Sequence, residues 1–490
     1  MDNTAHADIV PHRRIIGTPT LKAFLILVNI ISSVILYWIM LTYTDVSIST
    51  IGILSLITIA VNISILILSK ISLQSIIGFF LIGSYLFHLG QPILSSLGLE
   101  DFSLETIQAF SRVGLDDYFT ACFFAIIAHN LLVIGFVISS YFFKLDKPLK
   151  LNIPSKVSDE TIFKIGLAFF IISVIPTLYI DYNKWLLYLH GSYSDTYKFF
   201  YNGWISILTK PFMVSLLLMM IGKRKNQKVA LVILILSSMY MVFMMFKGNR
   251  ASQVIFLFII SFVYLKLVHK KKMKPKSILG LGIAGYFGVA IIDYIGSVRS
   301  SGLFGISSVI DGIAKNLNGS AIASFIDEMG CTLISLAYSV AYFPSFHAYN
   351  FGKTYLIALT AIYPNFGGAL GSLVDEYSFT NSFPEQVRQF LGGSYLGEAY
   401  FNFGFTGGLI GIILIGVFIS SVSNILEKSI LEDNILTTAI VMTVLPGMLI
   451  WLRGTFYGMV FDFVWFSIAI IILKNFFEVR EKRLLHRANL

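Results

Sequence analysis

The chain has 490 residues, of which 56% are hydrophobic and only 13% charged, and this composition excludes a soluble globular protein. The net charge of +9 does not indicate nucleic-acid binding, because the basic residues lie in short loops between apolar runs, where they report membrane topology. The two cysteines, Cys122 and Cys331, form neither a disulfide framework nor a metal-ligand pattern.

Apolar runs of about twenty residues, the length that a helix needs to cross a bilayer, recur along the chain. The first run, 21–41, follows three basic residues at 12–14 and has no cleavage site after it, so we expect it to stay as a helix with its basic end inside. The further predicted spans are 48–69, 72–97, 118–143, 161–181, 203–222, 229–246, 251–268, 277–296, 402–423, 435–452 and 455–474. The sequence therefore predicts an all-α fold, a polytopic membrane helix bundle of about 12 spans that forms one integral membrane domain over residues 1–490.

Most of the 36 lysines and arginines fall on one side of this layout, in loops such as GKRKNQK at 222–228 and HKKKMKPK at 269–276. By the positive-inside rule, we expect both termini in the cytoplasm. The longest connection on the outer side, 297–400, is much longer than a connection requires, and long ordered loops usually carry function. Within it, residues 320–343 and 354–370 are apolar enough to dip into or cross the membrane, which as a pair would give about 14 spans with unchanged sidedness.

The end of this loop has the sequence GGSYLGEAYFNFGFTGGLIG, 392–411, which passes directly into an apolar run. Glu398 lies at the entry, and Tyr395 and Asn402 share its helix face at spacings of three and four residues. Charge at a membrane entrance is costly, so we expect Glu398 to have a catalytic or ligand-binding role. The alternative is that its carboxylate only stabilises the first helical turn.

Arginines are few on the predicted outer side, and four of them lie near a span or the end of the long loop. These are Arg250, Arg299, Arg388 and Arg453. The planar guanidinium binds phosphate oxygens through two parallel hydrogen bonds, which suits the diphosphate of a lipid carrier. Arg250, in FKGNRASQ, opens a predicted helix, so its side chain and the free helix amides could face one anion together. The alternative for each is an interfacial arginine that contacts lipid headgroups.

Other residues of the long loop are weaker candidates. His347, within YFPSFHAYN, is the only histidine of the loop, and either packs among aromatic rings or contacts substrate. The acidic pairs Asp327-Glu328 and Asp375-Glu376 are alternative general bases. The sequence has no Walker motif, HExxH, paired-cysteine zinc site, GxSxG or DxD pair. A reaction without metal or cofactor, with a lipid-linked donor, fits this inventory best.

The order of these features resembles the Wzy-type O-antigen polymerases of bacteria, in the C-type glycosyltransferase superfamily: many spans, a GNR turn opening a middle helix, a long outer loop, and then GSYLGEAYFNFG at 393–404. The 393–404 string is similar to the family's ending before a membrane span. Elsewhere the likeness lies in topology and loop placement only.

The resemblance implies an inverting, metal-independent glycosyltransferase at the periplasmic face of the inner membrane. It would move a growing glycan from undecaprenyl diphosphate to the next lipid-linked repeat unit, with a chain-length regulator as a candidate partner. Glu398 would deprotonate or orient the acceptor hydroxyl, and Arg250 with Arg299 or Arg453 would stabilise the leaving diphosphate. Arg388, Tyr395, Asn402 and His347 are the further residues expected to contact substrate.

Two alternatives remain open from the sequence. An O-antigen ligase has similar topology and depends on a loop histidine, for which His347 is available, although the GEAYFNFG ending favours the polymerase. A flippase or other secondary transporter would fit twelve spans, but we find no inverted repeat, and few charges lie within spans apart from Asp293 and Asp462 near span ends.

Overall fold

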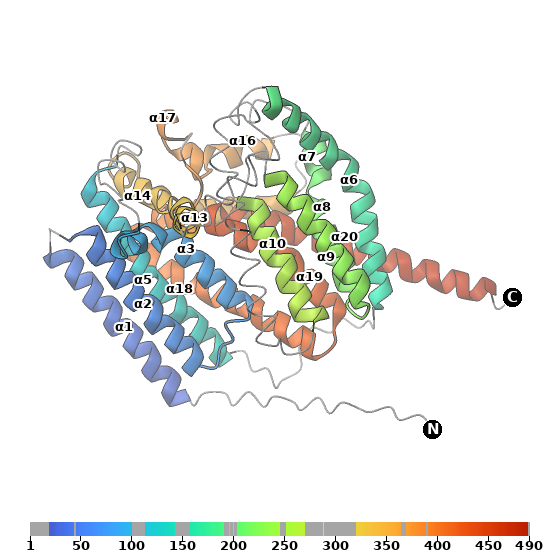
Figure 1. Cartoon of the computed structure of the whole chain (residues 1–490), viewed down its shortest axis with the longest axis horizontal. Coiled ribbons are helices and arrows are strands. Elements are labelled where there is room, and N and C mark those ends of the chain that lie inside the picture. The colour runs from blue at the N-terminus through green and yellow to red at the C-terminus, as the bar shows by residue number, and fades with distance from the viewer. Residues whose placement is uncertain are drawn as a thin grey trace.

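The computed structural model describes residues 19–43, 46–99, 113–142, 157–190, 196, 199, 203–245, 251–269, 288, 320–363, 369–388 and 391–488. Every regular element within these residues is a helix, which confirms the all-α prediction (Figure 1). The helices are α1 (Pro19–Thr42), α2 (Ile48–Leu68), α3 (Ile76–Ser96), α5 (Leu115–Phe142), α6 (Asp159–His190), α7 (Gly203–Thr209), α8 (Pro211–Gly222), α9 (Gln227–Met245), α10 (Ala251–Val263), η2 (Tyr264–Val268), α13 (Ser320–Gly330), α14 (Leu333–Tyr342), α15 (Lys353–Ala358), η3 (Leu359–Ile362), α16 (Ala369–Glu376), η4 (Thr380–Ser382), α17 (Glu385–Arg388), α18 (Tyr395–Leu431), α19 (Ile435–Ile450), η5 (Trp451–Arg453) and α20 (Phe456–Ala488).

Ten of the described helices are long and apolar enough to cross a membrane, with α7 and α8 forming one of them together. They correspond to ten of the predicted spans. The span predicted at 251–268 corresponds to a shorter apolar helix, Ser252–Val268, and the span predicted at 277–296 lies outside the described residues. The chain is therefore a multi-pass membrane protein.

Within the described residues, neither segment that we considered as an additional span forms one continuous helix of spanning length, and their dipping into or crossing the membrane stays a prediction. Residues 320–343 divide into α13 and α14, of 11 and 10 residues, with a turn at Cys331 and Thr332 between them. The apolar part of the second segment is Lys353–Ile362, made of α15 and η3. Each helix is shorter than the roughly 17 residues that the thinnest span requires.

The helices form two groups that α19 joins (Figure 1). In the first group, α5 packs against α1, α2, α3, α14 and α18. In the second, α6 packs on α8, and α9 on both α8 and α10. The contact between α5 and α18 is close because glycines face each other there: a Cβ on Gly135 would lie 2.3 Å from the carbonyl oxygen of Ile413. Small residues of this kind allow membrane helices to approach closely.

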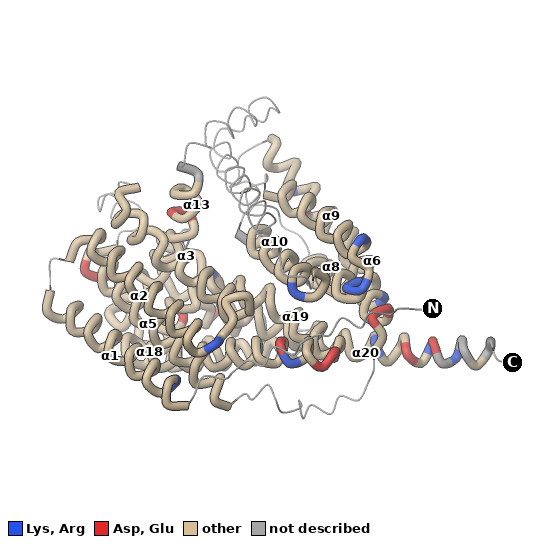
Figure 2. The backbone as a smooth tube through the Cα atoms, turned by 60° about the horizontal axis from the view of Figure 1, so that its bottom comes forward, with Lys and Arg blue, Asp and Glu red and all other residues tan. Residues whose placement is uncertain are grey.

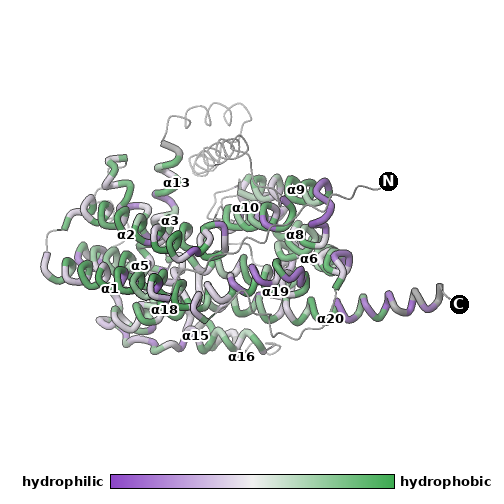
Figure 3. Tube along the Cα trace, turned by 90° about the horizontal axis from the view of Figure 1, so that it is seen from below, coloured by the Kyte–Doolittle hydropathy of each residue, from purple (hydrophilic) through white to green (hydrophobic). Residues whose placement is uncertain are grey.

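Charge is confined to a few regions of this bundle. Most residues along the tube in Figure 2 are uncharged. The charged residues gather at helix ends and along the last part of α20, which extends beyond the bundle. Figure 3 shows the same contrast as apolar spans and a hydrophilic end of α20. At the predicted inner end, Arg224 pairs with Asp159 and Asp433 at 3.0 and 2.7 Å, which ties the α8–α9 turn to α6 and to the α18–α19 turn.

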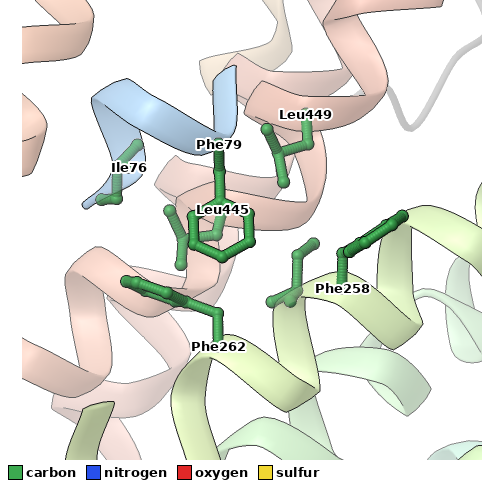
Figure 4. A pocket seen from close by; sticks show the side chains of 7 residues that line it. Ile76, Phe79, Phe258, Phe262, Leu445 and Leu449 are labelled. Atoms are coloured by element: carbon green, nitrogen blue, oxygen red, sulfur yellow. The ribbon is translucent and has the colours of Figure 1, made fainter. Parts of the chain in front are cut away.

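A small apolar crevice marks the place where the two groups meet. It is lined by Ile76, Phe79, Phe258, Ile259, Phe262, Leu445 and Leu449, which come from α3, α10 and α19 (Figure 4). Its volume is about 10 Å³, about the least that one water molecule requires. The crevice is therefore part of the packing between the groups and offers no room for a ligand.

Candidate functional site

The stretch 392–411 contains the start of a membrane helix, and this start lies earlier in the chain than predicted. We placed the span at 402–423, whereas α18 begins at Tyr395. Ser394 has an extended backbone, with φ −160° and ψ 129°, and its Oγ accepts a hydrogen bond from the Gly397 amide at 3.1 Å. This is an N-cap interaction, which satisfies one of the free amides of the first turn. The cap explains why the polar residues 395–402 are already helical.

Gly404 bends α18 where the polar part meets the apolar part. It has φ +69° and ψ −165° inside the helix, a conformation that is essentially restricted to glycine. The carbonyls of Phe401 and Asn402 accept hydrogen bonds from the amides of Asn350 and Phe351, at 3.2 and 2.7 Å. Segment 349–351 thus packs into the bend.

Gly404→Ala is expected to lower the free energy of unfolding by roughly 1–3 kcal/mol from backbone strain alone, and more because its Cβ would lie 2.7 Å from Tyr349 Cζ. Gly411→Ala, on the same helix, is the matched control because its Cβ would meet only Phe403 ring atoms at 3.8 and 3.9 Å. Thermal unfolding of the purified proteins in detergent measures both. Equal melting temperatures for the two variants would contradict the strain argument.

Glu398 is buried, with 1% of its surface exposed, and its partners lie on the α19–α20 turn. Its Oε2 accepts a hydrogen bond from the Trp451 indole at 2.8 Å and another from the Phe456 amide at 3.0 Å. Phe456 is the first residue of α20, so a carboxylate from α18 caps a different helix. Negative charge is stabilising at the positive end of a helix. Glu398 therefore joins the start of α18 to the start of α20.

Tyr395 and Asn402, the predicted companions of Glu398, are also buried, and each contacts a different part of the fold. The Tyr395 hydroxyl lies 2.7 Å from Ser84 Oγ on α3. Asn402 Nδ2 donates to Thr354 Oγ1 on α15 and to the backbone carbonyl of Glu398, both at 2.7 Å. Thr354 also hydrogen-bonds to the Glu398 side chain, so Glu398 and Asn402 share this partner, whereas Tyr395 bonds to Ser84. The three residues attach the first turns of α18 to α3, α15 and α20.

Two buried histidines on neighbouring helices complete this attachment, and neither was predicted from the sequence. His88 Nδ1 lies 3.0 Å from the Ser84 carbonyl, and its Nε2 lies 2.8 Å from Ser394 Oγ. A neutral imidazole that donates through Nδ1 accepts through Nε2, so the Ser394 hydroxyl donates to His88 while capping α18. Both histidines could have been singled out from the sequence. An ionisable residue inside an apolar span is a candidate for function or tight packing.

His129 fixes the direction of the second set of hydrogen bonds in the same way. Its Nδ1 lies 2.6 Å from the Ala125 carbonyl, and its Nε2 lies 2.8 Å from Ser84 Oγ. Ser84 therefore donates to His129, and the Tyr395 hydroxyl donates to Ser84. Each of these side chains is buried. The start of α18 is thus held by a connected set of hydrogen bonds that runs through α3 to α5.

Arg453 lies at the junction between the end of the long loop and the α19–α20 turn. The Gly393 amide donates to the Arg453 carbonyl at 3.2 Å. A Cβ on Gly393 would lie 2.6 Å from backbone atoms of Gly454, and one on Gly392 would lie 3.4 Å from Arg453 Nε. Gly393 therefore allows the two backbones to touch, and Gly392 leaves room for the Arg453 side chain. The Arg453 side chain is half-buried, and no described carboxylate forms an ion pair with it.

The α13–α14 turn borders this junction with polar groups. Gln91 Nε2 on α3 donates to Asp327 Oδ1 at 3.1 Å and to Cys331 Sγ at 3.2 Å. Burial, with Asp327 close by, raises the pKa of the Cys331 thiol to about 11, although the nearby Arg453 lowers it. The thiol is therefore protonated at neutral pH, which makes it a poor nucleophile. Asp327 belongs to one of the acidic pairs that we considered as general bases.

The remaining predicted residues lie elsewhere. Arg388 donates from Nε to the Phe383 carbonyl and from a terminal nitrogen to the Asn381 carbonyl, both at 2.7 Å, so it holds the turn before α17. His347 is exposed, with its ring 6.1 Å from that of Phe343. Arg250 and Arg299 lie outside the described residues, as does the side chain of Asp375. Among described residues, no group of three His, Cys, Asp or Glu side chains is arranged to hold a metal ion.

Comparison with known protein families matches the chain to the family described as O-antigen polysaccharide polymerase Wzy. The match covers residues 23–478, which is nearly the whole chain and includes Arg453 and the residues that surround it. No curated protein and no solved structure matches the chain.

Proposed function

The chain belongs to the O-antigen polysaccharide polymerase Wzy family, and from this premise we propose that it transfers a growing glycan from undecaprenyl diphosphate to the next lipid-linked repeat unit. The family match over residues 23–478 is the observation that carries the proposal. The many apolar helices agree with a substrate whose carrier is a membrane lipid.

In the proposed reaction, a hydroxyl of the acceptor sugar attacks the anomeric carbon of the donor glycan. A glycosidic bond forms, the bond from that carbon to the diphosphate oxygen breaks, the diphosphate keeps the electron pair, and the proton of the acceptor hydroxyl passes to a base or to water. Attack on the face opposite the leaving group inverts the anomeric centre. The energy comes from the sugar–diphosphate bond, so the proposal includes neither a nucleotide nor a metal ion.

The protein's main task in this reaction is to stabilise negative charge on the leaving diphosphate, and fixed cations are effective there. Arg453 is our candidate among the described residues, because its guanidinium has no carboxylate partner among them and its backbone is fixed by Gly393. Arg250 and Arg299 stay as predictions for the same role. The burial of Glu398 favours a positioning role, in which its carboxylate holds the turn that carries Arg453, over direct proton transfer.

We further propose that the Arg453 junction faces the periplasm and that both termini are cytoplasmic, in the inner membrane of a bacterium. Support comes from the basic turn at Lys223, Arg224 and Lys225. Arg224 pairs with Asp433 just before α19 begins, whereas Arg453 follows the end of α19, so the basic turn and Arg453 lie at opposite ends of this helix. The predicted contacts for the glycan stay Tyr395, Asn402, Arg388 and His347. A chain-length regulator stays a predicted partner.

Deleting the gene in its source strain tests the proposed function. We expect the ladder of lipopolysaccharide bands on a gel to collapse to core capped by a single repeat unit, because repeat units are still ligated but not polymerised. The wild-type gene should restore the ladder. Bare core would instead indicate a ligase, and an intact ladder would contradict a role in this polymer.

A further inference from the structure

A cavity whose lining does not include Arg453 lies among the helices of the second group, the end of α19 and the start of α20. Its volume is about 280 Å³, and its polar lining comes from five helices and the α7–α8 turn. The polar residues used below are Thr177, Asp181, Lys210, Tyr240, Gln253 and Asp462. Gln253 is the third residue of α10 and Asp462 the seventh of α20, so both lie within about 10 Å of a helix start. The cavity is therefore near one face of the bundle.

Two polar atoms of this cavity lack hydrogen-bond partners. Gln253 is only 7% exposed, and its Oε1 is buried with no partner within the described structure. Thr177 Oγ1 is buried without a partner in the same part of the chain. Buried polar groups in proteins are nearly always hydrogen-bonded, and an exception calls for a ligand or water that satisfies it. A molecule with hydroxyl or amide donors that entered the cavity would satisfy these two acceptors.

The charges of the cavity exclude a strongly anionic ligand. Lys210 is the one basic residue in the lining, whereas Asp181 and Asp462 are both acidic. The Lys210 ammonium lies 3.4 Å from the ring centroid of Phe461 and interacts with Asp462, while Tyr240 donates a hydrogen bond to Asp181. A diphosphate would meet two carboxylates and only one ammonium. A neutral ligand with many hydroxyls would find both donors and acceptors.

We propose that this cavity binds one neutral sugar ring of the lipid-linked repeat unit, an inference that rests on the proposed function. Gln253, Thr177 and the two carboxylates supply acceptors and Lys210 supplies donors, while Phe212 offers an apolar surface for a ring face. The volume of about 280 Å³ is at the low end for small-molecule sites. It suits a single ring, and the other sugars of the unit would extend out of it.

Binding of single sugars to the purified full-length protein in lipid nanodiscs tests the proposal. The probes are methyl glycosides of each neutral sugar that composition analysis finds in the polysaccharide of the source strain, detected by saturation-transfer NMR. We expect at least one to bind the wild type, and to bind Gln253→Leu about tenfold more weakly, since leucine keeps the volume and loses the hydrogen bonds. Met245→Leu is the matched control, because Met245 is 1% exposed and does not line the cavity.

The same variants separate this proposal from the proposed function in a polymerisation assay with lipid-linked repeat units. Gln253→Leu should raise KM about tenfold with a much smaller change in kcat, because it weakens binding away from the reacting bond. A wild type that polymerises but binds none of the glycosides would overturn the sugar site and leave the function intact. A wild type that binds a glycoside but neither polymerises nor supports the ladder would overturn the function and leave the site intact. Inorganic pyrophosphate can be added as a competitor of the glycoside. If it displaces the glycoside from the wild type and from Gln253→Leu but not from Lys210→Met, the cavity would be assigned to the diphosphate instead.

Discussion

Arg453→Ala is expected to lower the rate of polymerisation by about 10²- to 10³-fold, the loss that follows removal of one group that stabilises developing negative charge. The protein should still fold, because the contact that fixes this turn is made by the backbone. The Arg453 carbonyl, which accepts the hydrogen bond from the Gly393 amide at 3.2 Å, is present in alanine as well. The guanidinium itself has neither an ion pair nor a side-chain hydrogen bond among the described residues, so its removal leaves no buried partner unsatisfied.

The measurement is the turnover of purified lipid-linked repeat unit in nanodiscs, with thermal unfolding of each variant recorded beside it. Arg453→Lys should fall between the wild type and alanine, since lysine keeps the charge but loses the two-pronged geometry. Arg480→Ala is the charge-matched control, because Arg480 is exposed near the other end of α20. A wild-type rate in Arg453→Ala, at unchanged stability, would remove Arg453 from the proposed mechanism.

The sequence predicted the spans well because the length and hydropathy of a membrane helix are local properties of the chain. Ten spans correspond to described helices, and most of their ends differ by only a few residues. The start of α18 was missed by seven residues for a physical reason. Residues 395–402 follow a polar loop in the sequence, yet they are helical, with Ser394 as the N-cap and with side-chain hydrogen bonds to Ser84, Thr354 and Trp451.

Those partners could not be predicted, because they lie 311, 48 and 53 residues away in the chain. Helical spacing correctly put Tyr395, Glu398 and Asn402 near one another on the helix, but it could not say which elements each would contact: α3 for Tyr395, α15 for Asn402 and the α19–α20 turn for Glu398. The glycine pair at 392–393 is visible in the sequence. Its use, a backbone contact with Gly454, depends on the fold.

His88 and His129 are a different case, because their signal was local and was overlooked. Attention to the long loop singled out His347, which is exposed and lies 6.1 Å from Phe343 between ring centroids. Both overlooked histidines lie within predicted spans, where an ionisable side chain needs a partner. In the structure they orient Ser84 and Ser394, and so they contribute to holding the start of α18.

Glu398 provides the sharpest test of the site, because two substitutions separate a positioning role from general-base catalysis. Glu398→Ala should both destabilise the protein and lower its activity by at least about 10²-fold. It leaves the Trp451 indole and the Phe456 amide without an acceptor, and each unsatisfied buried donor costs roughly 1–3 kcal/mol. The turn that carries Arg453 would then lose its connection to α18.

Glu398→Gln keeps an oxygen that can accept both hydrogen bonds and removes only the charge, whose interaction with the start of α20 is of order 0.3–1 kcal/mol. If Glu398 acts by holding the turn, the glutamine variant should keep its melting temperature and retain activity within about tenfold of the wild type. A general base cannot be replaced by an amide, so in that case glutamine should lose about 10²- to 10⁴-fold in rate while remaining folded. Turnover and thermal unfolding of the two variants, measured on the same preparations, therefore decide whether Glu398 serves the reaction through Arg453 or takes the proton of the acceptor hydroxyl itself.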